Sequence, residues 1–140
     1  MTEVDLLIEE YTKHPVNNFE MKDATISRHE GNFICWDDIT VYLDIQDNCI
    51  KKMSFSWNPS NITLAASSLL AELIENQPID EVMKRNYETM IENGFEVSPK
   101  RKRAAVIALL AVRNAIHILR DDKNEKGEII EDDFDDLLDD

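Results

Sequence analysis

The chain offers one compact set of residues that could do chemistry, a thiol and a carboxylate in Cys35-Trp36-Asp37. A thiolate at Cys35 could bind a soft metal or attack a sulfur atom, and Asp37 could orient a ligand or a metal-bound water. Two ligands fall short of the roughly four that a stable zinc or iron–sulfur site uses. The alternatives are a partly buried structural cysteine and a solvated turn aspartate beside Asp38. These residues alone therefore indicate either a reactive thiol or a structural one.

The other residues of suitable type form no recognisable site. We interpret Cys49, which falls in a predicted hairpin turn, as an exposed and incidental thiol. The three histidines are scattered along the chain and fit no metal-ligand spacing. Ser60 has no histidine base at a recognisable spacing, and a chain with three glycines has no glycine-rich phosphate loop. We therefore predict no catalytic residue and a protein that is not an enzyme.

The elements that would position Cys35 follow from the spacing of apolar residues. Alternation with a period of two predicts strands, and a period near 3.6 predicts helices. The pattern predicts a helix, three strands and three further helices, over residues 2–13, 24–29, 39–45, 50–57, 62–74, 78–93 and 100–120. Asn61 and Ser98 are the predicted caps of the helices that follow them. This order predicts an α+β fold, in which a small antiparallel sheet packs against a run of helices.

The charge of the chain is unevenly spread. The formal net charge is −14 at pH 7, of which residues 121–140 carry −9. An acidic chain argues against binding to the phosphate backbone of a nucleic acid. One short basic cluster is the exception, and it could dock on an acidic protein surface or be a solvated helical turn. The members of this basic cluster are Lys100, Arg101, Lys102 and Arg103.

The sequence also predicts a compartment. The longest apolar run covers nine residues, 104–112, and a membrane span needs about 20. The acidic start of the chain lacks the basic and apolar regions of a secretory signal. Two cysteines in such a chain indicate a reducing environment rather than a disulfide framework. We therefore expect a cytoplasmic protein without a membrane segment.

The end of the chain is compositionally distinct. We expect residues 1–121 to form one domain and residues 122–140 to be a disordered acidic tail that keeps the protein in solution. Four apolar residues in this tail nevertheless stand at helical spacing, namely Ile130, Phe134, Leu137 and Leu138. Such a stripe could instead dock on a partner groove or fold back on the domain.

Several segments, taken in order, resemble one protein family. They are Cys35-Trp36-Asp37, the hairpin over 39–57, the alanine- and serine-rich stretch 64–72, the helix start at 79–82 and the stretch 98–104 that leads into the last helix. Their order and spacing are similar to those of the NifU/IscU/SufU-type scaffolds of iron–sulfur cluster assembly, which share the SufE/NifU fold. The resemblance covers roughly residues 11–118.

The departures from the family fall at its ligand positions. The resemblance makes Cys35 the first of three ligand cysteines, but Ser60 and Ala104 stand at the second and third positions, and Arg103 replaces a histidine or lysine common before the third. It implies a divergent scaffold-like protein in which Cys35 is a sulfur acceptor or sole ligand and Asp37 supports it. The implied partner is a cysteine desulfurase or another assembly protein that docks on the basic cluster.

Two further possibilities remain open. The cargo would be an iron–sulfur cluster, or zinc, with ligands completed by another chain. Alternatively, the protein is a non-catalytic interaction module that keeps the scaffold fold and has lost metal and cluster binding.

Overall fold

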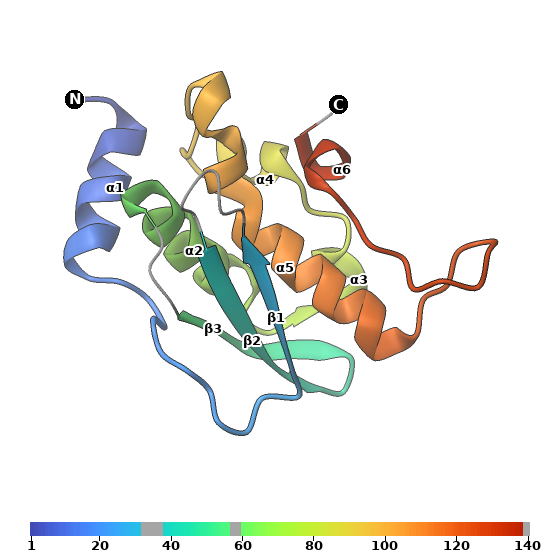
Figure 1. The fold of residues 1–140 in the computed structure, drawn as a ribbon. Helices are drawn as coiled ribbons and strands as arrows, with labels where there is room; N and C mark the ends of the chain where they lie inside the picture. Colours follow the sequence, from blue (N-terminus) through green and yellow to red (C-terminus); the bar gives the residue numbers. More distant parts are fainter. Residues whose placement is uncertain (32–37, 57–59, 139–140) are drawn as a thin grey trace.

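The protein is an antiparallel sheet with helices packed on one of its faces. The computed structural model describes residues 1–31, 38–56 and 60–138. The sheet has the order β1-β2-β3-β4, with strands Ile26–Gly31, Asp38–Gln46, Cys49–Ser56 and Gln77–Pro78. The helices are α1 Glu3–Lys13, α2 Asn61–Ile74, α3 Ile79–Val82, α4 Tyr87–Glu92, the 3₁₀ turn η1 Pro99–Arg101, α5 Lys102–Arg120 and α6 Phe134–Leu138. The predicted α+β class is confirmed (Figure 1).

The central hairpin of the sheet follows from the alternation in the sequence. In β2, Ile39, Val41 and Leu43 are fully buried, and the residues between them are half-buried on the other face. The strands β2 and β3 are joined at Asp47 and Asn48, whose φ angles of 53° and 59° are left-handed. Asn and Asp tolerate this conformation, so they allow the tight two-residue connection.

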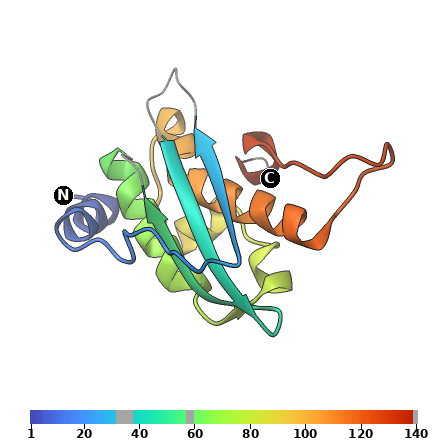
Figure 2. The same ribbon diagram turned by 60° about the horizontal axis from the view of Figure 1, so that its bottom comes forward.

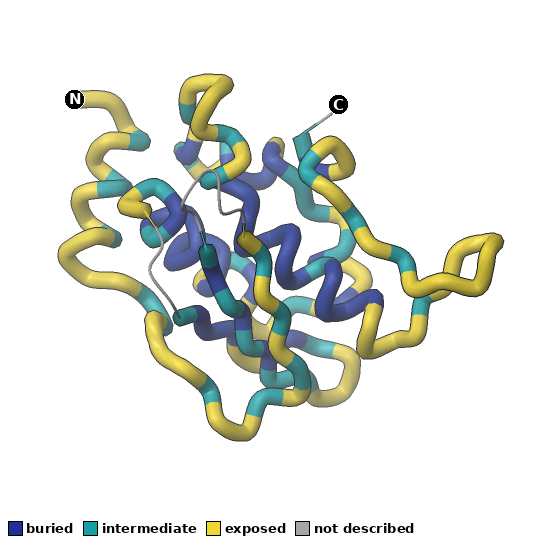
Figure 3. The backbone as a smooth tube through the Cα atoms, viewed as in Figure 1, coloured by how far each residue is buried: buried dark blue, intermediate teal, exposed yellow. Residues whose placement is uncertain are grey.

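The helices α2 and α5 cover the inner face of the sheet. Figure 2 shows the sheet in front with these helices behind it, and Figure 3 shows that buried residues concentrate where the layers meet. The inner positions of both helices are rich in alanine, including Ala65, Ala66, Ala108 and Ala111, all at most 3 % exposed. Small side chains let helix and sheet backbones approach closely, which fixes α5 across β1 and β2.

Three helix boundaries differ from the sequence predictions. The cap of α2 is Ser60 and not Asn61, because the Ser60 hydroxyl accepts from the Thr63 N–H at 3.3 Å. The expected helix over 78–93 is two short helices, because Pro78 pairs with Cys49 in the sheet and Asn86 starts a new helix with a capping box. Ser98 makes no side-chain cap, and the chain enters α5 through η1 instead.

The end of the chain also differs from the expected disordered tail. Lys123 and Ile129 form an isolated antiparallel bridge, and α6 follows and packs on α5. Leu137 is only 1 % exposed, although 122–140 is strongly acidic. The apolar stripe therefore folds back on the domain in residues 122–138, which we call the C-terminal segment. The proposal that 1–121 folds without it stays a prediction.

Candidate functional site

The predicted chemical residues belong to the link between β1 and β2. The ladder of these strands ends with Gly31 opposite Asp38. Cys35 and Asp37 fall between the two, in residues 32–37, which lie outside the part of the chain that the structure describes. The strand ends on either side of this link are described, as are Ser60 and Ala104, the predicted second and third ligand positions.

A histidine and a carboxylate meet at the edge of this link. His29 of β1 forms a hydrogen bond through Nε2 to a carboxylate oxygen of Asp38, the first residue of β2. Both side chains lie on the outer face of the sheet, with 56 % of the His29 side chain exposed. We interpreted His29 from the sequence as one of several scattered histidines. The strand register, which puts His29 two residues from Gly31, is what brings it next to Asp38.

At the second ligand position, Ser60 serves the helix that it begins. Its Oγ accepts from the backbone N–H of Thr63 at 3.3 Å and donates to the Thr63 hydroxyl at 3.2 Å. A capping serine of this kind satisfies an N–H group that the first turn of a helix leaves without an intrahelical partner. The side chain at this position is therefore engaged in stabilising α2.

At the third ligand position, Ala104 lies half-buried in the first turn of α5 and offers only a methyl group. Arg103 beside it is exposed, and its guanidinium carbon lies 5.2 Å from the centre of the Phe134 ring in α6. In the same turn, the Lys102 ammonium lies 5.3 Å from the centre of the Tyr87 ring. Contacts of this length are favourable cation–π interactions. Within the basic cluster, Lys102 and Arg103 therefore lie over aromatic rings, and Lys100, Arg101 and Arg103 are exposed.

These positions do not fit an iron–sulfur cluster. Iron in such clusters is held by cysteine thiolates, and neither a capping hydroxyl nor a methyl group replaces one. Among the described residues, no group of three or more His, Cys, Asp or Glu side chains could hold a metal ion. Whatever Cys35 and Asp37 contribute, Ser60 and Ala104 cannot complete a cluster site with them.

A second cluster of charged side chains joins α5 to the C-terminal segment. Asp132 Oδ2 lies 2.9 Å from Arg113 Nε and 3.0 Å from His117 Nε2. The other ring nitrogen of His117 lies 2.8 Å from Asp122 Oδ2. His117 therefore lies between two carboxylates, with one ring nitrogen on each. The sequence analysis missed these partners because it treated residues 122–140 apart from the helix before them.

The same contacts affect the ionisation of Asp122. The hydrogen bond from His117 is the largest cause that lowers the pKa of the Asp122 carboxyl below its ordinary value, and Arg120 adds to it. Both partners favour the charged carboxylate. Asp122, the second residue after α5, is therefore anchored to the last turn of the helix, and Asp121 between them adopts a left-handed φ of 57°.

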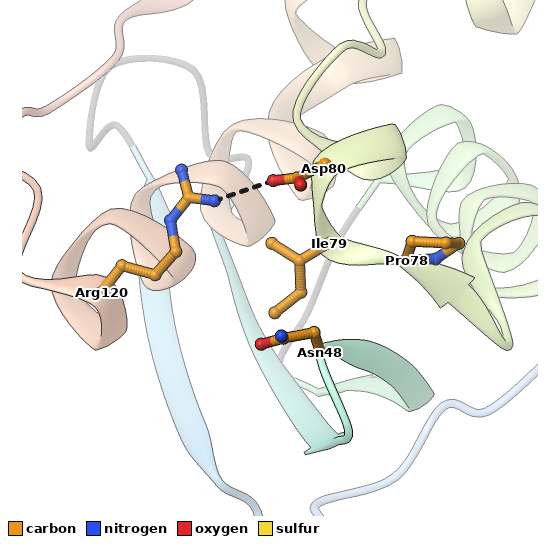
Figure 4. Close-up of a pocket in the computed structure, with 5 residues that line it drawn as sticks. All are labelled: Asn48, Pro78, Ile79, Asp80 and Arg120. Atoms are coloured by element: carbon orange, nitrogen blue, oxygen red, sulfur yellow. Dashed lines mark hydrogen bonds and ion pairs between the residues drawn. The ribbon is translucent and has the colours of Figure 1, made fainter.

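A small cavity lies at the other end of the hairpin from Asp38. It has a volume of about 280 Å³ and is lined by Asn48, Pro78, Ile79, Asp80 and Arg120. Figure 4 shows Arg120 reaching from the end of α5 to Asp80 at the start of α3, with a distance of 3.3 Å between Nη1 and Oδ1. The cation in this cavity already has carboxylate partners, and none of the predicted site residues lines it.

The comparisons with known proteins identify the class and then the family. The α+β fold matches solved structures of cluster-assembly scaffolds. A putative iron–sulfur cluster assembly scaffold for the SUF system from Fervidobacterium islandicum superposes with a TM-score of 0.68 at 19 % identity, over 79 % of this chain and 93 % of that one. A NifU-like N-terminal protein from Brucella abortus gives 0.68 at 16 % identity, over 86 % and 96 %. These likenesses concern the fold alone.

The sequence places the chain within a family. Residues 3–126 match the family described as the NifU-like N-terminal domain, and the chain belongs to this family. Two curated relatives from Archaeoglobus fulgidus, the iron–sulfur cluster assembly scaffold proteins IscU 1 and IscU 2, are each 25 % identical over 107 residues, 76 % of this chain and 70 % of theirs. The IscU scaffold of Thermotoga maritima is 32 % identical over 63 residues, 45 % of this chain and 44 % of that one. The resemblance inferred from the sequence is confirmed.

Proposed function

We propose that this protein works in iron–sulfur cluster assembly as a divergent member of its family, which accepts sulfur on Cys35 and does not assemble a cluster alone. The observation that carries the proposal is the family match over residues 3–126, combined with serine at position 60 and alanine at position 104, where the resemblance leads us to expect ligand cysteines. The curated relatives are named as cluster-assembly scaffolds, which supports the pathway. The missing thiols argue against independent assembly.

Accepting sulfur needs one thiolate and no metal. The Cys35 thiolate would attack the outer sulfur of a cysteine persulfide on a desulfurase. The S–S bond of that persulfide breaks, its cysteine leaves as a thiolate, and Cys35 becomes the new persulfide, so that no net oxidation occurs. The partner would dock through the basic cluster, whose members Lys100, Arg101 and Arg103 are exposed and suit an acidic surface.

The test follows the mass of the protein after incubation with a cysteine desulfurase and cysteine. We expect one added sulfur on the wild type and on Cys49→Ala, and none on Cys35→Ala. Cys49 is a suitable matched control because it is a free, half-buried thiol at the start of β3. An unmodified wild type, or an adduct that persists in Cys35→Ala, would reject the acceptor role.

The second candidate is a non-catalytic interaction module that keeps the scaffold fold. It is supported by the role of Ser60, which stands at a predicted ligand position and caps α2. Under this alternative, partners bind the wild type and Cys35→Ala equally. Binding of zinc by Cys35, Asp37 and a second chain is a third reading, and metal analysis of protein purified without added metal tests it.

A further inference from the structure

The C-terminal segment occupies one face of α5 with contacts of both polar and apolar kinds. This face includes Arg103 near the start of α5 and Arg113 and His117 further along it. Both views place α6 beside the N-terminal half of α5 (Figures 1 and 2). The family match covers residues 3–126, and α6 lies beyond it. The α5 face, in contrast, lies within the matched residues.

The polar contacts converge on Asp132. Its carboxylate meets Arg113 and His117, whose side chains are 16 % and 10 % exposed. Its backbone is bound as well, because its N–H donates to Asn114 Oδ1 at 2.7 Å and its carbonyl accepts from Asn114 Nδ2 at 3.1 Å. Asn114 itself is 1 % exposed. This face of α5 therefore binds both the carboxylate and the backbone of Asp132.

The apolar contacts follow at helical spacing. Phe134, two residues after Asp132, lies under the guanidinium of Arg103. Leu137 is 1 % exposed, and Leu138 is half-buried against the core. Residues at i, i+3 and i+4 lie on one face of a helix, as in other helices that bind in grooves. The other face of α6 carries the exposed Asp135 and Asp136.

We propose that this face of α5 is a docking groove for an acidic amphipathic helix. In the free chain the groove is held by α6, and a partner helix of the same character competes for it. The partner would present an aspartate two residues before an aromatic residue, with leucines three and four residues after the aromatic. The inference deepens the partner docking proposed above, since Arg103 belongs to both the basic cluster and the groove.

Because α6 belongs to the same chain as the groove, its occupancy of the groove can be measured. A tethered segment sits at an effective concentration in the millimolar range, so α6 should keep weak ligands out of the groove. The probe is a fluorescent peptide of residues 128–138, measured by anisotropy against full-length protein. We expect the peptide to bind the Leu137→Asp variant at least ten times more tightly than the wild type, because the substitution removes the occupant from the groove.

Matched variants separate recognition from general charge attraction. In the Leu137→Asp background, Arg113→Ala should weaken peptide binding at least tenfold, whereas Lys84→Ala, which removes an equal charge paired with Glu81 on α3, should leave it unchanged. A peptide with Asp132→Asn should bind more weakly than one with Asp133→Asn. The docking-groove proposal is overturned if the peptide binds the wild type and Leu137→Asp equally, or binds neither. It is also overturned if the two substitutions of a matched pair have equal effects.

A second form of the protein tests the proposal if the Leu137→Asp variant does not fold. Gly127 is exposed in open space, so a site-specific protease sequence can be inserted after it. After cleavage, the groove keeps its natural occupant without the tether. The labelled peptide should then exchange into the cleaved protein and not into the uncleaved one, and a lack of exchange contradicts the proposal. Sulfur transfer to Cys35 is measured separately, so either proposal can fail without the other.

Discussion

Replacing Asp132 with asparagine tests whether the charged contacts hold the C-terminal segment. Asparagine keeps the shape of the side chain and removes the charge that faces Arg113 and His117. The carboxylate is 11 % exposed, and breaking a buried ion pair costs roughly 3–5 kcal/mol. The segment can lift away and let water reach the side chains of Arg113 and His117, which limits the loss. We therefore expect the free energy of unfolding to fall by about 2–3 kcal/mol.

Two measurements check this expectation. Urea unfolding followed by circular dichroism gives the free energy, and hydrogen exchange of residues 123–138 shows whether the segment has detached. Asp133→Asn is the matched control, because Asp133 is the exposed neighbour and bonds only within the start of α6 among the described contacts. Equal stability and equal exchange in the two variants would refute the idea that Asp132 anchors the segment.

Three further predictions concern the site positions and the pH dependence. Ser60→Ala should lower the free energy of unfolding by about 1 kcal/mol through loss of the cap, and Ser60→Asp should retain most of it; equal losses in both contradict the capping role. Ser60→Cys combined with Ala104→Cys should raise bound zinc, measured by elemental analysis, above the wild type and either single variant, and no gain argues against the ligand assignment. The lowered pKa of Asp122 means that its stabilising contribution is present above the ordinary aspartate pKa and is lost as pH falls through the lowered value. Asp122→Asn should therefore flatten the acid side of the stability curve, and an unchanged curve speaks against this linkage.

The fold was predictable where local patterns and core burial agree. The alternation of Ile39, Val41 and Leu43 predicts a half-buried strand, and each of these residues is fully buried in β2. The alanine-rich pattern after residue 104 likewise predicts a close-packed helix, as found in α5. These elements follow from periodicity because the same residues that set the pattern also form the core.

The C-terminal segment was not predictable in this way. Its composition indicates disorder, because acidic residues bury little apolar surface by themselves. The partners of Asp132 stand on α5, 15 to 19 positions earlier in the chain, and no local pattern reveals them. Only the packed helix puts Arg113 and His117 on the face where the returning chain passes.

The family could be predicted from the sequence, whereas the assignment of the site residues stays a prediction. The order of motifs around Cys35 led to the family, which is confirmed, while Cys35 and Asp37 lie outside the described residues. Ser60 and Asn61 are both residues that favour the N-cap position, so the sequence does not decide between them. The structure shows that Ser60 is the cap of α2.

The hydrogen bond made by the Ser60 hydroxyl limits which side chains position 60 can carry without weakening α2. A thiol is a weak hydrogen-bond acceptor, so a cysteine at this position would leave the Thr63 N–H poorly satisfied. Metal binding and the start of α2 therefore make opposing demands on one side chain. A single Ser60→Cys change would weaken the cap, and it would complete no metal site while position 104 carries alanine. A variant with thiols at both positions would therefore pass through a single-cysteine form that is less stable and binds no metal better, so the cap of α2 favours serine at position 60.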